Sequence, residues 1–198
     1  VTEKLSTYEG LADKEWEGKL VLRTSKKVYN QSLVSSLIAE HGEKEAEKIV
    51  SGWVTNLAVD PFSNDTKALE AVAAGIGDAT IVNTYYFGRL MKKKPELPLE
   101  IFWPNQKSNG VHMNVSGAGV TAHSKNKDGA IKLIEWLSGV EAQEQFAGLN
   151  MEYPVNSKVK VDPVVEKWGE FKGNPMNVAK YGELQATAIK LMDRVGYK

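Results

Sequence analysis

The sequence predicts an α/β fold, from the order of its expected elements and from their apolar patterns. Short β-branched apolar runs, typical of buried strands, occur at residues 19–23 and 77–82. Three segments with helical apolar spacing lie between these runs, and a fourth helix-forming segment follows the second run. In folds of this class ligands bind at the carboxyl ends of strands, so the residues after each run are the first candidates for a site.

The first expected helix carries a tyrosine at its start. After the strand at 19–23, a short loop leads to Tyr29, with Asn30 expected as the N-cap and Gly42 as the helix end. Tyr29 would then stand just before a helix N-terminus, where free N–H groups such as that of Gln31 favour an anion. This helix should bury an apolar stripe made of Leu33, Val34, Leu37 and Ile38.

Two further helices are expected before the second strand. One covers about residues 43–57 and ends before Asp60-Pro61. The next begins at a cap among residues 63–65 and runs through Ala74, where Gly75 ends it. The strand at 77–82 follows.

Two adjacent tyrosines, Tyr85 and Tyr86, lie where this strand ends and the next helix is expected to begin. Asn83 or Thr84 is placed to cap that helix, which continues until Pro95. In the first turn of a helix, successive side chains diverge by only about 100°, so both hydroxyls can converge on one small ligand. A hard, highly charged cation such as Fe³⁺ can displace the phenol proton and hold the phenolate. For a tyrosine pair alone, the alternative is structural, with one ring in the core and the other at the surface.

The remaining elements are expected in order along the chain. Strands are expected at 99–103 and 111–115, and again at 120–123. The intervening Gly117 and Gly119 imitate a dinucleotide-binding fingerprint, but a strand follows where that fingerprint needs a helix, so we interpret them as a bend or hinge. Further helices are expected at 127–137, 140–147 and 177–195.

Composition and motifs exclude several classes of function. The 25 basic residues equal the 25 acidic residues, so no overall field favours nucleic acid or an anionic membrane. No apolar run of membrane-spanning length is visible, so membrane insertion is not expected, and the absence of cysteine excludes zinc–thiolate sites and cysteine nucleophiles. The three histidines, His41, His112 and His123, form no recognisable catalytic or zinc motif.

Several motifs of the sequence resemble those of a known protein family. Asn83-Thr84-Tyr85-Tyr86-Phe87-Gly88-Arg89-Leu90 looks like the signature of ferric iron-binding proteins, the periplasmic receptors of bacterial iron ABC transporters. The stretches at 23–33, 114–120 and 137–155 resemble that family in the same order.

The resemblance implies a two-lobed, clam-like binding protein that carries Fe³⁺ between its lobes. This chain would form a type II periplasmic-binding-protein-like lobe of it, with a mixed sheet flanked by helices. Tyr85 and Tyr86 match the paired metal ligands. Tyr29 matches a third tyrosine of one branch, whereas in another branch that loop binds a synergistic phosphate; carbonate is the other anion considered. Asn83 matches a residue that hydrogen-bonds near the site. Asn30 and Gln31 are expected to contact the anion or to support the ligands.

One departure from the family is large. The residues that build most of the family's N-terminal lobe precede the point where this chain begins, and because it begins at Val1 we expect a processed or excised product. Residues 1–115 and 166–198 would form the C-terminal lobe, and residues 116–165 would belong to the other lobe. The missing N-terminal lobe is then itself an expected partner.

The function expected is therefore periplasmic binding of Fe³⁺ and its delivery to an ABC transporter permease, without catalysis. A receptor for another small solute, such as a polyamine, thiamine or a phosphonate, is the alternative within the same fold. A small α/β enzyme that uses Tyr85 or Tyr86 as an acid is a third possibility, against which stands the lack of a paired base.

Overall fold

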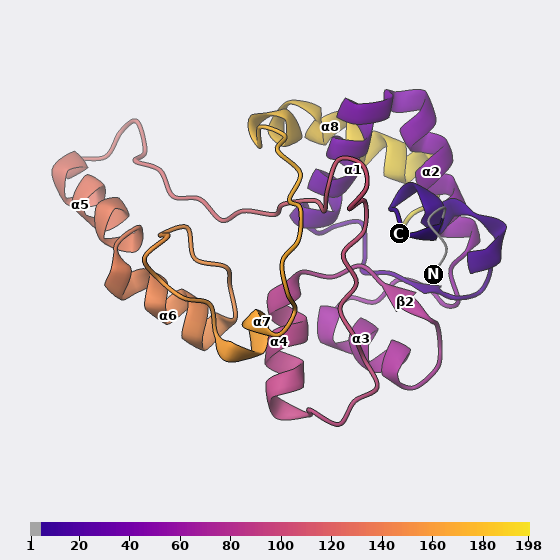
Figure 1. Cartoon of the computed structure of the whole chain (residues 1–198). Coiled ribbons are helices and arrows are strands. Elements are labelled where there is room, and N and C mark those ends of the chain that lie inside the picture. Colours follow the sequence, from indigo (N-terminus) through magenta and orange to yellow (C-terminus); the bar gives the residue numbers. More distant parts are fainter. Residues whose placement is uncertain (1–4) are drawn as a thin grey trace. The chain divides into compact units, whose positions relative to one another are not determined.

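The computed structural model describes residues 5–198, which fall into two compact units. The first comprises residues 5–83, 97–114 and 170–198, and the second comprises residues 84–96 and 115–169. Figure 1 shows the elements in chain order. No helix of residues 5–198 has both the length and the apolar character that crossing a lipid bilayer requires.

The first unit contains a small parallel sheet. β1 (Leu20–Val21) pairs with β2 (Ala79–Thr80), with Leu20 opposite Ala79. Single parallel bridges extend the pairing from Leu20 to Leu57 and from Arg23 to Phe62. Both strands lie within the apolar runs that predicted them, and β1 is fully buried.

Later strands predicted from the sequence do not form. Residues 99–103 and 120–123 are irregular, and within 111–115 only Val111 makes a bridge, to Gly173. In the first of these segments the Trp103 ring stacks on Phe171 at a centroid distance of 4.2 Å. Trp103 is therefore held by ring packing, which periodicity cannot distinguish from pairing in a sheet.

Four α-helices cover the sheet of the first unit: α1 (Val28–His41), α2 (Glu43–Thr55), α3 (Asp65–Ala73) and α8 (Ala179–Arg194). Short 3-10 turns at Glu9–Ala12 and Lys14–Trp16 precede them. α1 packs against both α8 and α2 (Figure 1). The predicted stripe of α1 is buried, as is Trp53 of α2 at 1% exposure. Gly42 ends α1 with φ +80°, as expected of a glycine there.

The regular structure described in the second unit consists of helices. It contains α4 (Thr84–Lys93), α5 (Lys127–Leu137), α6 (Val140–Asn150) and α7 (Pro163–Glu166). α5 has the bounds predicted for it, whereas α7 was not predicted. α4 lies close to Met151 and Trp168 because Gly88 has no side chain: an added Cβ would lie 2.9 Å from the Cβ of Met151.

Candidate metal centre

The two adjacent tyrosines occupy the first turn of α4, as predicted. Their ring centroids are 4.4 Å apart with an angle of 36° between the ring planes, and both side chains are half-buried. One turn further along, the guanidinium carbon of Arg89 lies 5.1 Å from the Tyr85 ring centroid and 5.0 Å from that of Tyr86. The structure thus brings Tyr85, Tyr86 and Arg89 into a single cluster.

The cluster is held in place and carries positive potential. Arg89 donates from Nη1 to Oδ1 of Asn150 at 2.6 Å, which ties the guanidinium to the end of α6. Phe87 and Leu90 of the same helix are buried, and their packing holds α4, and with it the two tyrosines, in position. The guanidinium and the N-terminus of α4 both favour negative charge nearby.

Tyr29 lies inside α1 rather than ahead of it, so the predicted helix start was wrong. The helix begins at Val28 with Lys27 as its N-cap, and Tyr29 is in the first turn. Asn30 does not cap because its side-chain amide donates to the carbonyls of Arg23 and Thr24, at 3.1 and 2.9 Å. The loop before α1 is tied down by this amide.

The hydroxyl of Tyr29 is engaged by a buried ion pair. It donates to the carboxylate of Asp65, with Oδ1 at 2.6 Å and Oδ2 at 2.7 Å, and it accepts from Nε of Arg23 at 3.2 Å. Nε of Arg23 also lies 2.8 Å from Oδ2 of Asp65. Burial, and next the hydrogen bond to Asp65, raise the pKa of Tyr29 well above its ordinary value. The phenol is therefore held protonated unless a strong Lewis acid displaces the proton.

The remaining predicted site residues make local contacts. Gln31 donates from its side chain to Ser25 O at 3.2 Å and accepts from Gln185 at 2.9 Å. Its backbone N–H donates to Lys27 O at 3.1 Å, so this N–H is already used within the helix. Asn83 accepts from the Asn114 amide at 3.2 Å.

Three residues of these networks were not singled out from the sequence. Arg89 could have been, because residues three and four apart on a helix are neighbours and Arg89 follows both tyrosines at that spacing. Arg23 and Asp65 offered no comparable signal, since Asp65 stands 36 residues from Tyr29 in the sequence. Tyr29 belongs to the first unit, and Tyr85 and Tyr86 to the second.

Comparison with known proteins identifies the family. Residues 4–176 match the profile of bacterial extracellular solute-binding proteins. The chain is 46% identical to iron uptake protein A2 of Synechocystis, over 98% of this chain and 58% of that protein. It therefore spans little more than half the length of that relative.

Solved structures agree in fold. A Trichodesmium protein in complex with iron and citrate ligands superposes with a TM-score of 0.93 at 48% identity, covering 100% of this chain and 65% of that one. A ferric binding protein from Campylobacter jejuni gives a TM-score of 0.93 at 35% identity, covering 98% and 64%. The predicted α/β class and the resemblance to ferric iron-binding proteins are confirmed. The chain belongs to the bacterial extracellular solute-binding protein family.

Proposed function

We propose that this protein binds Fe³⁺ through the phenolate oxygens of Tyr85 and Tyr86, with Tyr29 as a third ligand, and passes the ion to an ABC transporter permease in the periplasm. The observation that carries the proposal is the tyrosine pair at the start of α4, with the Arg89 guanidinium over both rings. The similarity to an iron uptake protein and to a structure holding iron supports this choice of cargo.

The charge balance favours a ferric ion. Each phenolate contributes one negative charge, so three of them neutralise Fe³⁺, and phenolate is a hard donor suited to a hard cation. A carbonate or phosphate would complete the coordination; the citrate in the Trichodesmium structure supports the idea that a small anion shares the metal. Arg89 would then offset part of the negative charge around the ion.

Ionisation of Tyr29 is less favourable than that of an ordinary phenol. Its proton lies between the phenol oxygen and Asp65, and the raised pKa makes its ionisation harder than that of a free phenol. Fe³⁺ has to supply this extra free energy when the third phenolate forms. At neutral pH, binding through Tyr29 should therefore be weaker than binding through an unhindered phenol, although each releases one proton.

A second lobe would complete the receptor. We assign residues 1–115 and 166–198 to the C-terminal lobe and residues 116–165 to the segment that returns to the N-terminal lobe. Supporting this, α5 and α6 expose large apolar side chains that a neighbouring domain would cover: Ile131, Leu133, Trp136, Phe146 and Leu149, with Leu149 exposed at 78%. The chain covers 58% of the iron uptake protein, which leaves length for that lobe.

Titration with Fe³⁺ followed in the visible range tests the proposal, because ferric phenolates absorb there. The wild-type chain should develop a band that a strong chelator bleaches, and Tyr85→Phe with Tyr86→Phe should abolish it. Tyr181→Phe is a matched control, since the buried Tyr181 hydroxyl has no hydrogen-bond partner among residues 5–198. A band of equal strength in the double variant would exclude the pair as ligands. A colourless protein that binds a polyamine, thiamine or a phosphonate would favour the alternative receptor.

A further inference from the structure

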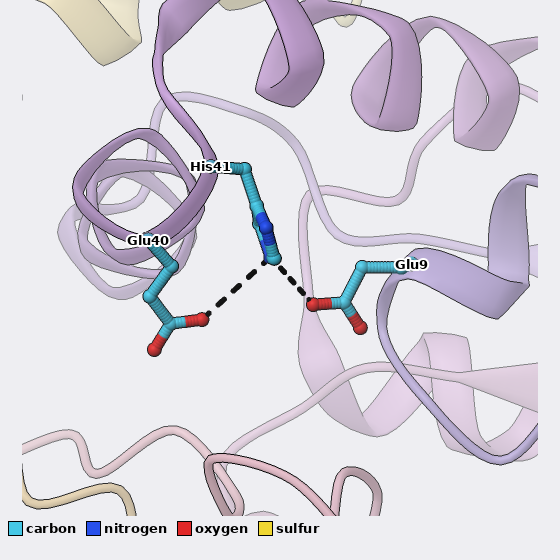
Figure 2. A group of neighbouring side chains, drawn as sticks. All are labelled: Glu9, Glu40 and His41. Carbon is cyan, nitrogen blue, oxygen red and sulfur yellow. Dashed lines mark hydrogen bonds and ion pairs between the residues drawn. The ribbon is translucent and has the colours of Figure 1, made fainter.

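A second cluster of potential metal ligands lies in the first unit, where the end of α1 meets the 3-10 turn at Glu9–Ala12. Glu9, Glu40 and His41 each offer one donor atom, and these atoms all lie within 4.8 Å of one another. Nε2 of His41 is 2.8 Å from Oε1 of Glu9 and 3.8 Å from Oε2 of Glu40. Figure 2 shows both carboxylates turned toward the same imidazole nitrogen.

Each carboxylate is oriented by an asparagine outside the cluster. Asn105, exposed at 4%, donates from Nδ2 to Oε2 of Glu9 at 2.9 Å, while its own Oδ1 accepts from the Tyr8 N–H. Asn174 donates from Nδ2 to Oε1 of Glu40 at 2.5 Å, while its Oδ1 accepts from the Met176 N–H. In both cases the amide occupies one carboxylate oxygen and leaves the other facing His41. Supporting hydrogen bonds of this kind orient the ligands in metal sites.

The charge of the cluster is not balanced within the described residues. His41 is the one cationic group of residues 5–198 that pairs with either glutamate, and it supplies at most one positive charge against two carboxylates. Burial and, after it, the charge of Glu40 raise the pKa of Tyr181.

The buried hydroxyl of Tyr181 points to the same imbalance. Its side chain is 8% exposed and its hydroxyl has no hydrogen-bond partner within the described part of the chain. It nevertheless lies close enough to Glu40 to respond to that negative charge. A cation at the cluster would relieve the repulsion between Glu9 and Glu40 and reduce the field at Tyr181.

We infer that Glu9, Glu40 and His41 form a site for a divalent transition-metal cation of the zinc type, separate from the tyrosine cluster. One imidazole nitrogen and two carboxylate oxygens are ligands that Zn²⁺ accepts, at about 2.0–2.2 Å, with a further position left for water. The side chains of His41 and Glu9, exposed at 30% and 26%, have room to close the short remaining distance around an ion. Ca²⁺, which takes oxygen ligands, gains little from the imidazole.

The competing explanation is a simple ion pair between protonated His41 and the two carboxylates. An ion pair needs no metal, and a partly exposed one contributes little to stability. The two explanations differ in what added Zn²⁺ does. A metal site gives saturable binding and raises the unfolding temperature by linkage, whereas an ion pair gives neither.

The experiment uses the full 198-residue chain, freed of metal by chelation and titrated with Zn²⁺ by calorimetry and by thermal unfolding. We expect one Zn²⁺ to bind and to raise the unfolding temperature. His41→Gln and Glu40→Gln should each weaken binding by at least about tenfold, and Asn174→Ala by about 10- to 100-fold. His123→Gln is the matched control, because His123 is exposed in the second unit, and should bind as the wild type does.

Two further measurements separate the outcomes. In NMR spectra of the wild-type chain, Zn²⁺ should shift the imidazole signals of His41 and leave those of His123 in place, which needs no variant to fold. The Tyr85→Phe, Tyr86→Phe chain should keep its Zn²⁺ site, so failure of the ferric proposal and failure of this one are distinguishable. Wild-type affinity in His41→Gln, an unmoved His41 signal, or Ca²⁺ binding as tightly as Zn²⁺ would each overturn the inference.

Discussion

The hydroxyl of Tyr29 donates to both carboxylate oxygens of Asp65, at 2.6 and 2.7 Å, in a pair of residues 36 positions apart in the sequence. Asp65 is 2% exposed and is also paired with the buried guanidinium of Arg23. The third tyrosine proposed to bind iron is thus part of a buried polar network. The same hydrogen bonds that stabilise the first unit must therefore change if the Tyr29 hydroxyl is to lose its proton and bind a metal.

The first prediction concerns the ion pair beneath Tyr29. Asp65→Asn should lower the free energy of unfolding by about 3–5 kcal/mol, because it leaves the Arg23 guanidinium buried without a charged partner. Urea unfolding measures the change. Asp60→Asn is the control: Asp60 is exposed, and its loss should have an effect near zero. Equal effects of the two substitutions would contradict the importance of burial here.

The second prediction concerns Tyr29 as a ligand. Tyr29→Phe removes the hydroxyl and keeps the ring, so it should weaken Fe³⁺ binding, shift the visible band, and make the remaining affinity depend on added phosphate or carbonate. Spectroscopic titration with and without each anion measures this. If band and affinity stay unchanged while Tyr85→Phe abolishes both, Tyr29 is structural and the site has two phenolates.

The third prediction concerns His112, whose Nε2 lies 2.9 Å from the Ser32 hydroxyl and whose ring packs on Tyr181 at 4.9 Å. Burial lowers the pKa of His112 from 6.5 to about 4. The unfolded chain therefore binds a proton between these values while the folded chain does not, so stability present above pH 6.5 is lost as the pH falls toward 4. His112→Gln should remove this part of the pH dependence, which is at most about 3 kcal/mol.

Urea unfolding at a series of pH values measures that difference, with His123→Gln as the exposed control. Parallel pH profiles for the wild type and His112→Gln would show that His112 is free to take up a proton in the folded protein.

The fourth prediction concerns the packing that fixes the tyrosine pair. Gly88→Ala would place a Cβ 2.9 Å from Met151 and 3.1 Å from the Trp168 ring, so α4 should shift and the protein should lose about 1–3 kcal/mol of stability. Gly182→Ala in α8 meets nothing within 4 Å and should be neutral or stabilising, because alanine favours helix. Thermal unfolding distinguishes the two, and an equal loss of stability in both variants would contradict the role of close packing at Gly88.

Sequence reasoning succeeded where local pattern decides structure. The stripe of α1, the bounds of α5, a cap for α3 among residues 63–65 and the tyrosines at the start of α4 follow from periodicity and capping, which act within a few residues. The family could be recognised for the same reason, since its signature is continuous along the chain.

It failed where distant residues decide. The run at 99–103 has the composition of a strand, but Trp103 packs on Phe171, which no local pattern reveals. Asn30 has the chemistry of a cap, but its amide is used to hold the carbonyls of Arg23 and Thr24. The partners of Tyr29 and the asparagines behind Glu9 and Glu40 are likewise brought together only by the fold.

Proton release on iron binding is the measurement that tests the central claim most directly. Phenols are protonated at neutral pH and must lose the proton to bind a metal, so Fe³⁺ binding through tyrosines releases one proton for each phenol engaged. Calorimetric titration of Fe³⁺, supplied as a weak chelate, in buffers of different ionisation enthalpy counts these protons. We expect a net release that is larger in the wild type than in Tyr29→Phe and is lost when Tyr85 and Tyr86 are both replaced by phenylalanine. Tight ferric binding with no proton exchanged with the buffer would contradict phenolate ligation.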